Sequence, residues 1–394
     1  MQWASTVSEE FSLRDAVSDA AGRIKASLGG EPPDLTVVFA SPHHAPDYED
    51  VPKFVQAALR SKVLIGCSGG GVIGGAHEVE DRIGLSITAA RLPGVEVSAF
   101  HVEDTGLPDM DASPAAWEKV VGVVPDKQPD FVLLVDPFSV RADALVVGLD
   151  YAFAGRAKVG GLASGGNEPG GNALFLGEQT HRAGVVGASL SGNVRVETIV
   201  AQGCRPIGGS MIVTKCHQNV LLELDGQKPM EALRKVFEAA SERDRYLVNT
   251  ALHLGIVTDP LKEQFKPGDF LIRNVLGLHR ESGGLVIGEL LAEGQVVQFH
   301  VRDAQTATED LRGMLRQFVA TPGSASRSGA LLFSCLGRGK HLFGQEDHDT
   351  GLFVKEVGSL PLGGFFCNGE IGPVGASTYL HGFTSSFGIF SPKA

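Results

Sequence analysis

One short apolar run ends in a turn made almost wholly of glycine, at Val63-Leu64-Ile65-Gly66-Cys67-Ser68-Gly69-Gly70-Gly71-Val72-Ile73-Gly74-Gly75. Such a run predicts a buried strand whose end carries few side chains. Glycine has no Cβ atom, so a ligand or a second backbone can come close to it. Variants of the pattern recur from Gly160 to Asn167 and from Gly363 to Glu370. Three such strand ends indicate a repeated architecture.

Composition restricts the class of protein. The chain has 394 residues, enough for two or three domains with a large core. Its formal charge of −12 argues against nucleic acid or an anionic membrane as partner, because both attract basic surfaces. No apolar run approaches the roughly 18 residues of a membrane span, and residues 1–12 show no secretion signal. We therefore expect a soluble cytoplasmic protein that contacts neither membrane nor nucleic acid.

Cysteine and histidine usage gives no metal motif. The five cysteines never form a CxxC pair, which favours free thiols in a reducing compartment and no zinc site. No HExxH motif is present, so we expect no dedicated metal site. A lone histidine can still ligate haem. His181, His300 and His381 follow predicted strands or turns, where a surface or core role is the simpler interpretation.

The first half contains two similar series of elements. The first series is a helix at 12–28, a strand at 35–40, a helix at 52–60, the glycine-rich stretch, and a hairpin of strands 83–88 and 95–100. The second is a helix from Ser113, a strand at 131–135, a helix at 142–153, a glycine-rich end at 159–167, and a hairpin of strands 184–189 and 194–199. Because order and spacing agree, we interpret 30–103 and 130–203 as an internal duplication.

The second half carries the same parts in another order. It contains a helix at 229–241, a hairpin of strands 284–288 and 296–301, a helix around 311–318, a polar loop at 323–329, a strand at 331–334 and the third glycine-rich end. The sequence thus predicts a mixed α/β fold of repeated β-α-β plus hairpin units, with mixed sheets layered between helices. Two closely packed halves are expected, at 10–210 and 211–394.

Two enzyme motifs match the opening stretch formally. Gly69, Gly71 and Gly74 satisfy G-x-G-x-x-G, but a polar segment and strands follow where a dinucleotide fold needs a helix. Without a lysine after the glycines, a phosphate-binding P-loop is excluded. The pattern G-x-S-x-G around Ser68 also needs a following helix, whose propensity is poor here. Cys67 or Cys367 as a thiolate nucleophile remains an alternative to the simpler role of a small buried hydrophobe.

Polar clusters accompany the glycine turns. Arg205, Arg302 and Arg338 follow or end predicted strands, and arginine is the usual fork for a carboxylate or phosphate. Exposed main-chain N–H groups of glycine turns also cradle anions. Structural ion pairs or turn-capping hydrogen bonds are the alternative role of these side chains.

The chain as a whole resembles the FIST family (F-box and intracellular signal transduction), as a stand-alone protein with FIST N and FIST C halves, over roughly residues 10–390. The resemblance rests on motifs at Ile65–Gly69, Gly160–Gly165, Gly203–Gly208, Phe299–Asp303, Cys335–Gly339, Gly364–Pro373 and His381–Thr384. It implies a sensory or small-ligand-binding module. Some members bind haem, which makes haem a candidate cofactor by resemblance, although this chain has no haem motif.

We therefore expect non-catalytic binding of a small polar or anionic ligand, with a protein partner for output and no catalytic residues. The alternatives are an enzyme with Cys67 or Cys367 as nucleophile and an interaction scaffold without a ligand. The candidate ligand-binding residues are Gly66, Cys67, Ser68, Gly69, Ser164, Arg205, Arg302, Arg338, Cys367, Asn368 and Glu370.

Overall fold

The computed structural model describes residues 1–262, 264–265, 268–321 and 327–393. They form two compact units, one comprising Met1–Val200 and Met314–Ala394, the other Ala201–Gly313. The second unit is therefore an insertion in the chain of the first. The expected halves, 10–210 and 211–394, divide the chain differently from these units and stay a prediction.

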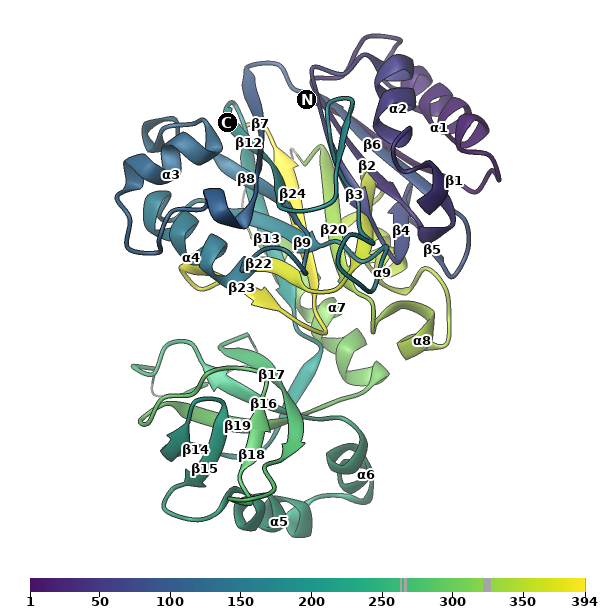
Figure 1. Ribbon diagram of the computed structural model, residues 1–394. Helices are drawn as coiled ribbons and strands as arrows, with labels where there is room; N and C mark the ends of the chain where they lie inside the picture. Colours follow the sequence, from purple (N-terminus) through teal and green to yellow (C-terminus); the bar gives the residue numbers. More distant parts are fainter. Residues whose placement is uncertain (263, 266–267, 322–326, 394) are drawn as a thin grey trace. The chain divides into compact units, whose positions relative to one another are not determined.

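The first unit shows a similar order of elements three times, although within the described residues the third series has two helices between its parallel strands and one strand fewer at its end (Figure 1). After β1 (Gln2–Ser8), the first series is α1 (Leu13–Ser27), β2 (Leu35–Ala40), α2 (Val51–Leu59), β3 (Val63–Ser68), β4 (Gly71–Gly74), β5 (His77–Glu80), β6 (Leu85–Arg91) and β7 (Val95–Val102). The second is α3 (Pro114–Val121), β8 (Asp130–Val135), α4 (Ala142–Ala152), β9 (Lys158–Leu162), β10 (Leu174–Leu176), β11 (Gln179–His181), β12 (Val185–Gly192) and β13 (Arg195–Ala201). The third is α7 (Ala304–Ala320), β20 (Gly329–Cys335), α8 (Gly339–Phe343), α9 (His348–Val357), β21 (Leu362–Cys367), β22 (Glu370–Val374), β23 (Ser377–His381) and β24 (Ser385–Ser391).

No sheet of this unit is built from one series. The three strand orders are β1-β6-β2-β3-β10-β11, β23-β22-β9-β8-β12-β7 and β13-β24-β20-β21-β4-β5. A parallel pair lies near the centre of each: β2 with β3, β8 with β9, and β20 with β21. A hairpin of another series extends each pair, and Figure 1 shows β22 and β23, at the yellow end of the chain, beside β9. The mixed α/β fold class is confirmed, and the duplication itself stays a prediction.

The hairpins predicted in the first half are wrong, although their strands exist. β6 pairs with β1 and β2, whereas β7 pairs with β12 in another sheet. In the second series β12 and β13 separate in the same way. The turn residues Pro93 and Gly94 act locally, while a strand's partner is set by where its apolar face is buried. The hairpins that do form are shorter, and each turns on a glycine with positive φ: Gly75, Gly177 and Gly375.

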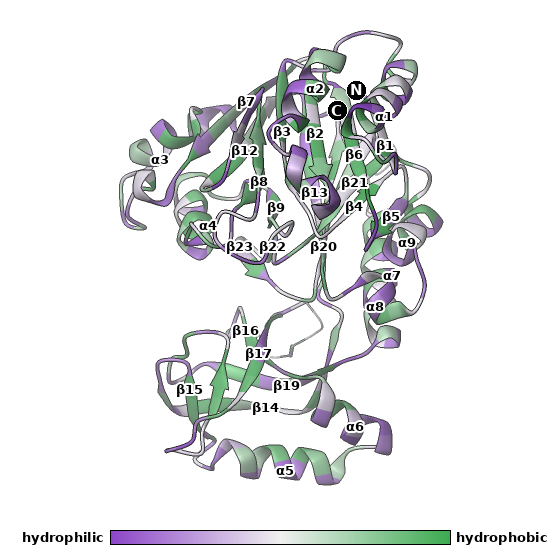
Figure 2. Cartoon of the chain, turned by 45° about the vertical axis from the view of Figure 1, so that its right-hand side comes forward, coloured by the Kyte–Doolittle hydropathy of each residue, from purple (hydrophilic) through white to green (hydrophobic). Residues whose placement is uncertain are grey.

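Most other elements of this unit are confirmed within a few residues. Helix α1 has Ser12 as its N-cap, whose hydroxyl accepts the Asp15 N–H at 3.1 Å. All six residues of β2 are buried, as a strand covered on both faces requires. Phe365 of β21 stacks on Phe39 of β2, with ring centroids 4.7 Å apart, and the strands that meet there are coloured mostly as hydrophobic in Figure 2. The core therefore lies between the sheets.

The described residues of the second unit form a closed barrel with helices α5 and α6, and the first part of α7 also belongs to this unit. Its strands follow the order β14-β15-β18-β17-β16-β19. The elements are β14 (Cys204–His217), β15 (Val220–Leu224), α5 (Pro229–Ala239), α6 (Glu242–Thr250), β16 (Leu252–Val257), β17 (Phe270–Leu278), β18 (Leu285–Ile287) and β19 (Val296–Arg302). Strands β18 and β19 exist, but the predicted hairpin between them is wrong, since β19 pairs with β14 and β16.

Two further predictions concern the loop at 323–329 and membrane-spanning helices. Most of the polar loop predicted at 323–329 lies outside the described residues. Among the helices of the described ranges, none is long and apolar enough to cross a membrane.

Candidate functional site

The three glycine-rich strand ends are packed against neighbouring strands. In each parallel pair, one glycine of the second strand lies directly against the first strand. A Cβ atom added at Gly66, Gly160 or Gly364 would lie 2.1, 1.9 or 1.8 Å from the carbonyl oxygen of Val38, Leu133 or Leu332. A side chain at these positions would displace the backbone of the sheet. The close approach that the sequence indicated is therefore made by a strand at these three positions.

Hydrogen bonds also join the ends to one another. The Ser164 hydroxyl donates to the Phe366 carbonyl and accepts the Gly70 N–H, the latter at 2.9 Å. The Ser164 N–H donates to the Ser68 carbonyl at 3.2 Å. The Ser68 hydroxyl accepts the Ala173 N–H at 2.9 Å. Two of the candidate positions, Ser68 and Ser164, thus belong to one hydrogen-bonded junction. The Gly69 N–H donates to the Ala40 carbonyl at 3.0 Å, and Gly66 packs on Val38.

The cysteines of the junction lie in the core. Cys67 and Cys367 are both fully buried. Burial raises the pKa of both thiols well above the ordinary value, and the nearby Glu370 carboxyl adds to the effect at Cys367. Since the thiolate is the reactive species, these surroundings disfavour nucleophilic chemistry at either sulfur.

The third glycine-rich strand end, after β21, is a polar turn that contains two further candidate residues, Asn368 and Glu370. Glu370 is fully buried and accepts the Thr384 N–H at 3.0 Å. Asn368 is exposed, and its side-chain amide donates to the Ala163 carbonyl at 3.4 Å. Both side chains make hydrogen bonds to loops next to the strands. This role is structural, and it is compatible with ligand binding.

Beside this turn lies a buried ion pair. Arg338 is fully buried, and its Nε and Nη2 donate to the two oxygens of Asp349 at 2.7 and 2.9 Å. Ser334 and Ser385 also donate to Asp349 through their hydroxyls. Burial alone would raise the pKa of Asp349, but the charge of Arg338 and the bond from His348 outweigh it and hold this pKa well below its usual range.

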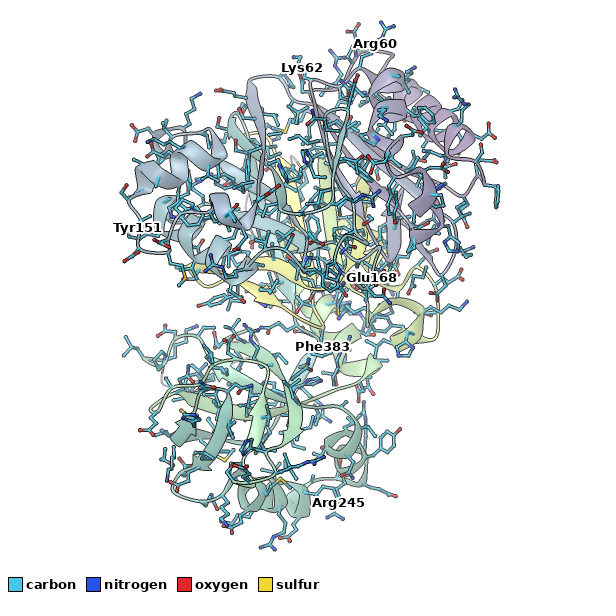
Figure 3. All side chains as sticks on the ribbon, in the orientation of Figure 1. Arg60, Lys62, Tyr151, Glu168, Arg245 and Phe383 are labelled. Atoms are coloured by element: carbon cyan, nitrogen blue, oxygen red, sulfur yellow. The ribbon has the colours of Figure 1, made fainter. Side chains whose placement is uncertain are left out.

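Backbone strain accompanies the ion pair. Phe383 has a φ of 65°, in the left-handed region that bulky side chains seldom adopt. The Phe383 carbonyl accepts an Nη1 hydrogen of Arg338 at 3.4 Å. Figure 3 labels Phe383, which lies on the loop between β23 and β24. Strain of this kind is concentrated at functional sites in many proteins, so it marks this cluster as a candidate.

Strand β5 ties the helices that follow Arg338 to the sheet. Glu78 accepts the Thr350 N–H of α9 at 2.8 Å, and Glu80 accepts the Lys340 N–H of α8 at 2.8 Å. In return, the Glu78 N–H donates to Asp347 at 2.6 Å. Sequence reasoning missed Glu78, although Glu78-Val79-Glu80 has the alternation of a half-buried strand.

Glu78 is itself unusual. Its side chain is 2% exposed, and its Oε2 has no hydrogen-bond partner among the described residues. Burial and the negative charge of Asp349 raise the pKa of Glu78 to about 8. Burial and the neighbouring negative charge therefore both favour the protonated form of the Glu78 carboxyl group.

A cavity of about 600 Å³ adjoins these residues. Its wall is formed by β1, the β4–β5 turn with Gly74 and Gly75, strand β5, and the loop before α9 with Asp347. Arg82 lies in the wall with an exposed side chain that pairs with Glu9 at 3.1 Å. The last two glycines of the stretch Val63–Gly75 therefore line the cavity.

Arg205 and Arg302 belong to the second unit. Arg205 pairs with Asp244 of α6. Arg302 is buried at the end of β19, opposite Cys204 of β14. The two residues thus lie in the barrel unit, and Arg338 in the other.

His77 does not fit a haem site. His77 lines the 600 Å³ cavity, but its ring nitrogen lies 3.2 Å from an Asp347 carboxylate oxygen, among arginines and carboxylates. A porphyrin needs a broad apolar wall beside its axial ligand. His300 is buried in the barrel unit, and His381 bonds to the Gly372 carbonyl. His181 stacks on His101, with ring centroids 3.7 Å apart. Within the described ranges no cluster of three or more histidine, cysteine or acidic residues is arranged to hold a metal ion.

Comparison with known proteins agrees with the resemblance. The FIST N domain matches residues 34–227, and the FIST C domain matches residues 229–373. The chain belongs to the FIST family, whose domains are generally signalling or sensory domains.

Relatives extend over the whole chain. "Uncharacterized protein Rv0628c" of Mycobacterium tuberculosis is 36% identical over 387 residues, which cover 98% of each chain. "Uncharacterized protein Mb0898c" of Mycobacterium bovis is 36% identical over 96% of this chain and 95% of its own. "F-box/LRR-repeat protein At5g63520" of Arabidopsis thaliana is 26% identical over 38% of this chain and 28% of its own.

Proposed function

We propose that this protein is a sensory module that binds a small polar or anionic ligand without catalysing a reaction on it. The observation that carries the proposal is that one cavity of the first unit, of about 600 Å³, is lined by Glu78 and Asp347; cavities of about 600 and 580 Å³ elsewhere in the unit are not. The volume of the cavity lined by Glu78 suits a small metabolite, and its wall is mainly polar, with charged side chains of both signs. Signalling in the wider family agrees with such a role.

The position of the cavity supports a sensory role. Asp347 and Glu78 belong to its wall and also hold α9 and the loop before it against β5. A ligand that contacts Asp347 would alter the bonds of this segment. The change would then be read on the outer surface by a protein partner. An equilibrium is shifted only by the difference in ligand affinity between two states, and these contacts supply such a difference.

Arg82 is the expected anchor for an anionic group of the ligand. Its side chain is 47% exposed, and its two carboxylate partners, Glu9 at 3.1 Å and Glu346 at 3.7 Å, are equally exposed. Exposed ion pairs contribute little, so a ligand carboxylate or phosphate competes with them at small cost.

The test is binding of small anions to the purified protein, with citrate, succinate, glycerol phosphate and inorganic phosphate as probes in thermal-shift and calorimetric titrations. Arg82→Ala should weaken binding by about tenfold or more, the loss expected for a charge-assisted hydrogen bond. Arg141→Ala is the matched control, because Arg141 is exposed and paired with Asp104 away from the cavity wall. Equal affinities of the two variants would refute Arg82 as the anchor, and no binding of any probe would refute an anionic ligand.

The alternative of a cysteine nucleophile gains no support from the surroundings of Cys67 and Cys367, which are fully buried with raised pKa values. An alkylation assay at neutral pH checks this directly. We expect both thiols to react more slowly than the partly exposed Cys335, whereas fast alkylation of Cys67 or Cys367 would restore the enzymatic alternative.

A further inference from the structure

The α8–α9 segment (residues 339–357) is fastened to the sheet by acidic side chains of β5. Glu78 and Glu80 lie two residues apart, so both project from one face of the strand. Each accepts a main-chain N–H near the start of a helix: Thr350 for Glu78 and Lys340 for Glu80. Neither helix is capped by the side chain of its own N-cap residue. Strand β5 therefore supplies the caps that these helices lack.

Several acidic side chains lie around Glu78, and Arg338, the cation near them, is paired with Asp349. Asp349 lies near Glu78 on α9 and accepts hydrogen bonds from Nε and Nη2 of Arg338. Glu80 faces Glu78 along β5, and Asp347 faces its main-chain N–H from the preceding loop. His348 donates to Asp349. An ionised Glu78 would therefore be repelled by the Asp349 carboxylate, because the positive charge of Arg338 is already paired with Asp349.

We infer that Glu78 is the proton-binding group of the candidate site, and that its protonated form holds the α8–α9 segment closed over β5. Two observations carry this: a carboxyl group with 2% exposure and an Oε2 atom without a hydrogen-bond partner among the described residues, and the bond of its Oε1 to the N–H of Thr350, the residue after Asp349, at 2.8 Å. The raised pKa agrees with this geometry. The inference requires no ligand. Its link to ligand binding rests on the proposed function, because Glu78 and Asp347 also line the cavity.

The pH window follows from linkage. Glu78 has a pKa of about 8 in the closed state, and its ordinary value is 4.5 when the segment opens. The closed state therefore binds the proton more tightly, and its advantage is complete below pH 4.5. Between about pH 5 and 8 the opening equilibrium should rise about tenfold for each pH unit, and above pH 8 it should level off.

The experiment is hydrogen exchange of the full chain, followed by mass spectrometry on peptides from residues 339–357 and corrected for intrinsic exchange rates. The wild type should show opening that rises about a hundredfold from pH 5.5 to 7.5. Glu78→Gln, which mimics the protonated acid, should remove the slope. Glu80→Gln is the control, since Glu80 lies on the same face and makes the same kind of bond. An unchanged slope in Glu78→Gln would overturn the inference.

A second measurement covers the case in which Glu78→Gln fails to fold. Carbon NMR of wild-type protein labelled at the glutamate carboxyl carbons reports every glutamate titration. One carboxyl group should titrate near pH 8. If all of them titrate below pH 6, the inference is wrong, whatever the outcome of the anion-binding test. If one titrates near pH 8 while no anion binds, the proton switch stands and the ligand proposal falls.

Discussion

The ends of two parallel strand pairs share a backbone arrangement and differ in chemistry. At the end of β2 and β3, Ser41 accepts the Gly84 N–H at 2.9 Å, and the Tyr48 hydroxyl donates to the Ser41 carbonyl at 3.2 Å. At the end of β20 and β21, the corresponding space holds the buried Arg338–Asp349 ion pair. The close packing of glycine that both ends share therefore belongs to the fold. The buried ion pair is what distinguishes the third end.

The comparison teaches how to separate structural from functional glycines. Gly66 and Gly364 are fixed by the neighbouring strand, whereas Gly75 lies at a turn in the cavity wall. A glycine-rich strand end is therefore weak evidence for a ligand. Charged residues that only one of several similar ends possesses are better evidence.

The largest expected effect is at the shared glycines. Gly66→Ala and Gly364→Ala each place a Cβ atom about 2 Å from a carbonyl oxygen, so each should cost more than the roughly 1–3 kcal/mol of ordinary overpacking. We expect little folded protein from either variant, measured by soluble yield and circular dichroism. Gly22→Ala in α1 is the control, because a Cβ atom there meets nothing within 4 Å. A folded Gly66→Ala variant of normal stability would show that the close packing of the strands does not require glycine at this position.

The next effect is specific to the third end. Asp349→Asn leaves the fully buried Arg338 without its counter-charge, which should cost about 3–5 kcal/mol in urea unfolding. Replacing both partners together, as Arg338→Met with Asp349→Leu, should recover much of this loss. If Asp349→Asn unfolds like the wild type, the ion pair contributes nothing to the third end.

The smallest effect is at the neutral end. Ser41→Ala removes the acceptor of the Gly84 N–H and should cost only about 1–3 kcal/mol, the penalty of one buried donor without a partner. The same unfolding assay measures it. A cost as large as that of Asp349→Asn would show that charge does not distinguish the two ends.

Elements were predictable from the sequence where their signals are local. The cap at Ser12 and the five apolar residues among the six of β2 mark their elements without reference to the rest of the chain. Pairing was not predictable, because β6 and β7 follow one another closely and yet enter different sheets. The barrel was missed because β14 contains Gly208 and Gly209, which break its strand pattern.

The candidate site was predictable only in part. Arg338 stood out as an arginine between glycines, but its partner Asp349 carries no motif of its own. Glu78 was missed because β5 has only four residues, and its burial depends on α9, which lies far away in sequence. Sites of this kind are assembled from separate segments, so spacing along the chain does not reveal them.

The central claim is that this chain binds a small ligand, and native mass spectrometry of the protein purified from its own host tests it most directly. We predict a stoichiometric excess of mass over the 41.4 kDa chain, released on denaturation, and lost in Arg82→Ala but retained in Arg141→Ala. The mass of the chain alone, unchanged after incubation with small polar metabolites extracted from the host, would contradict the account.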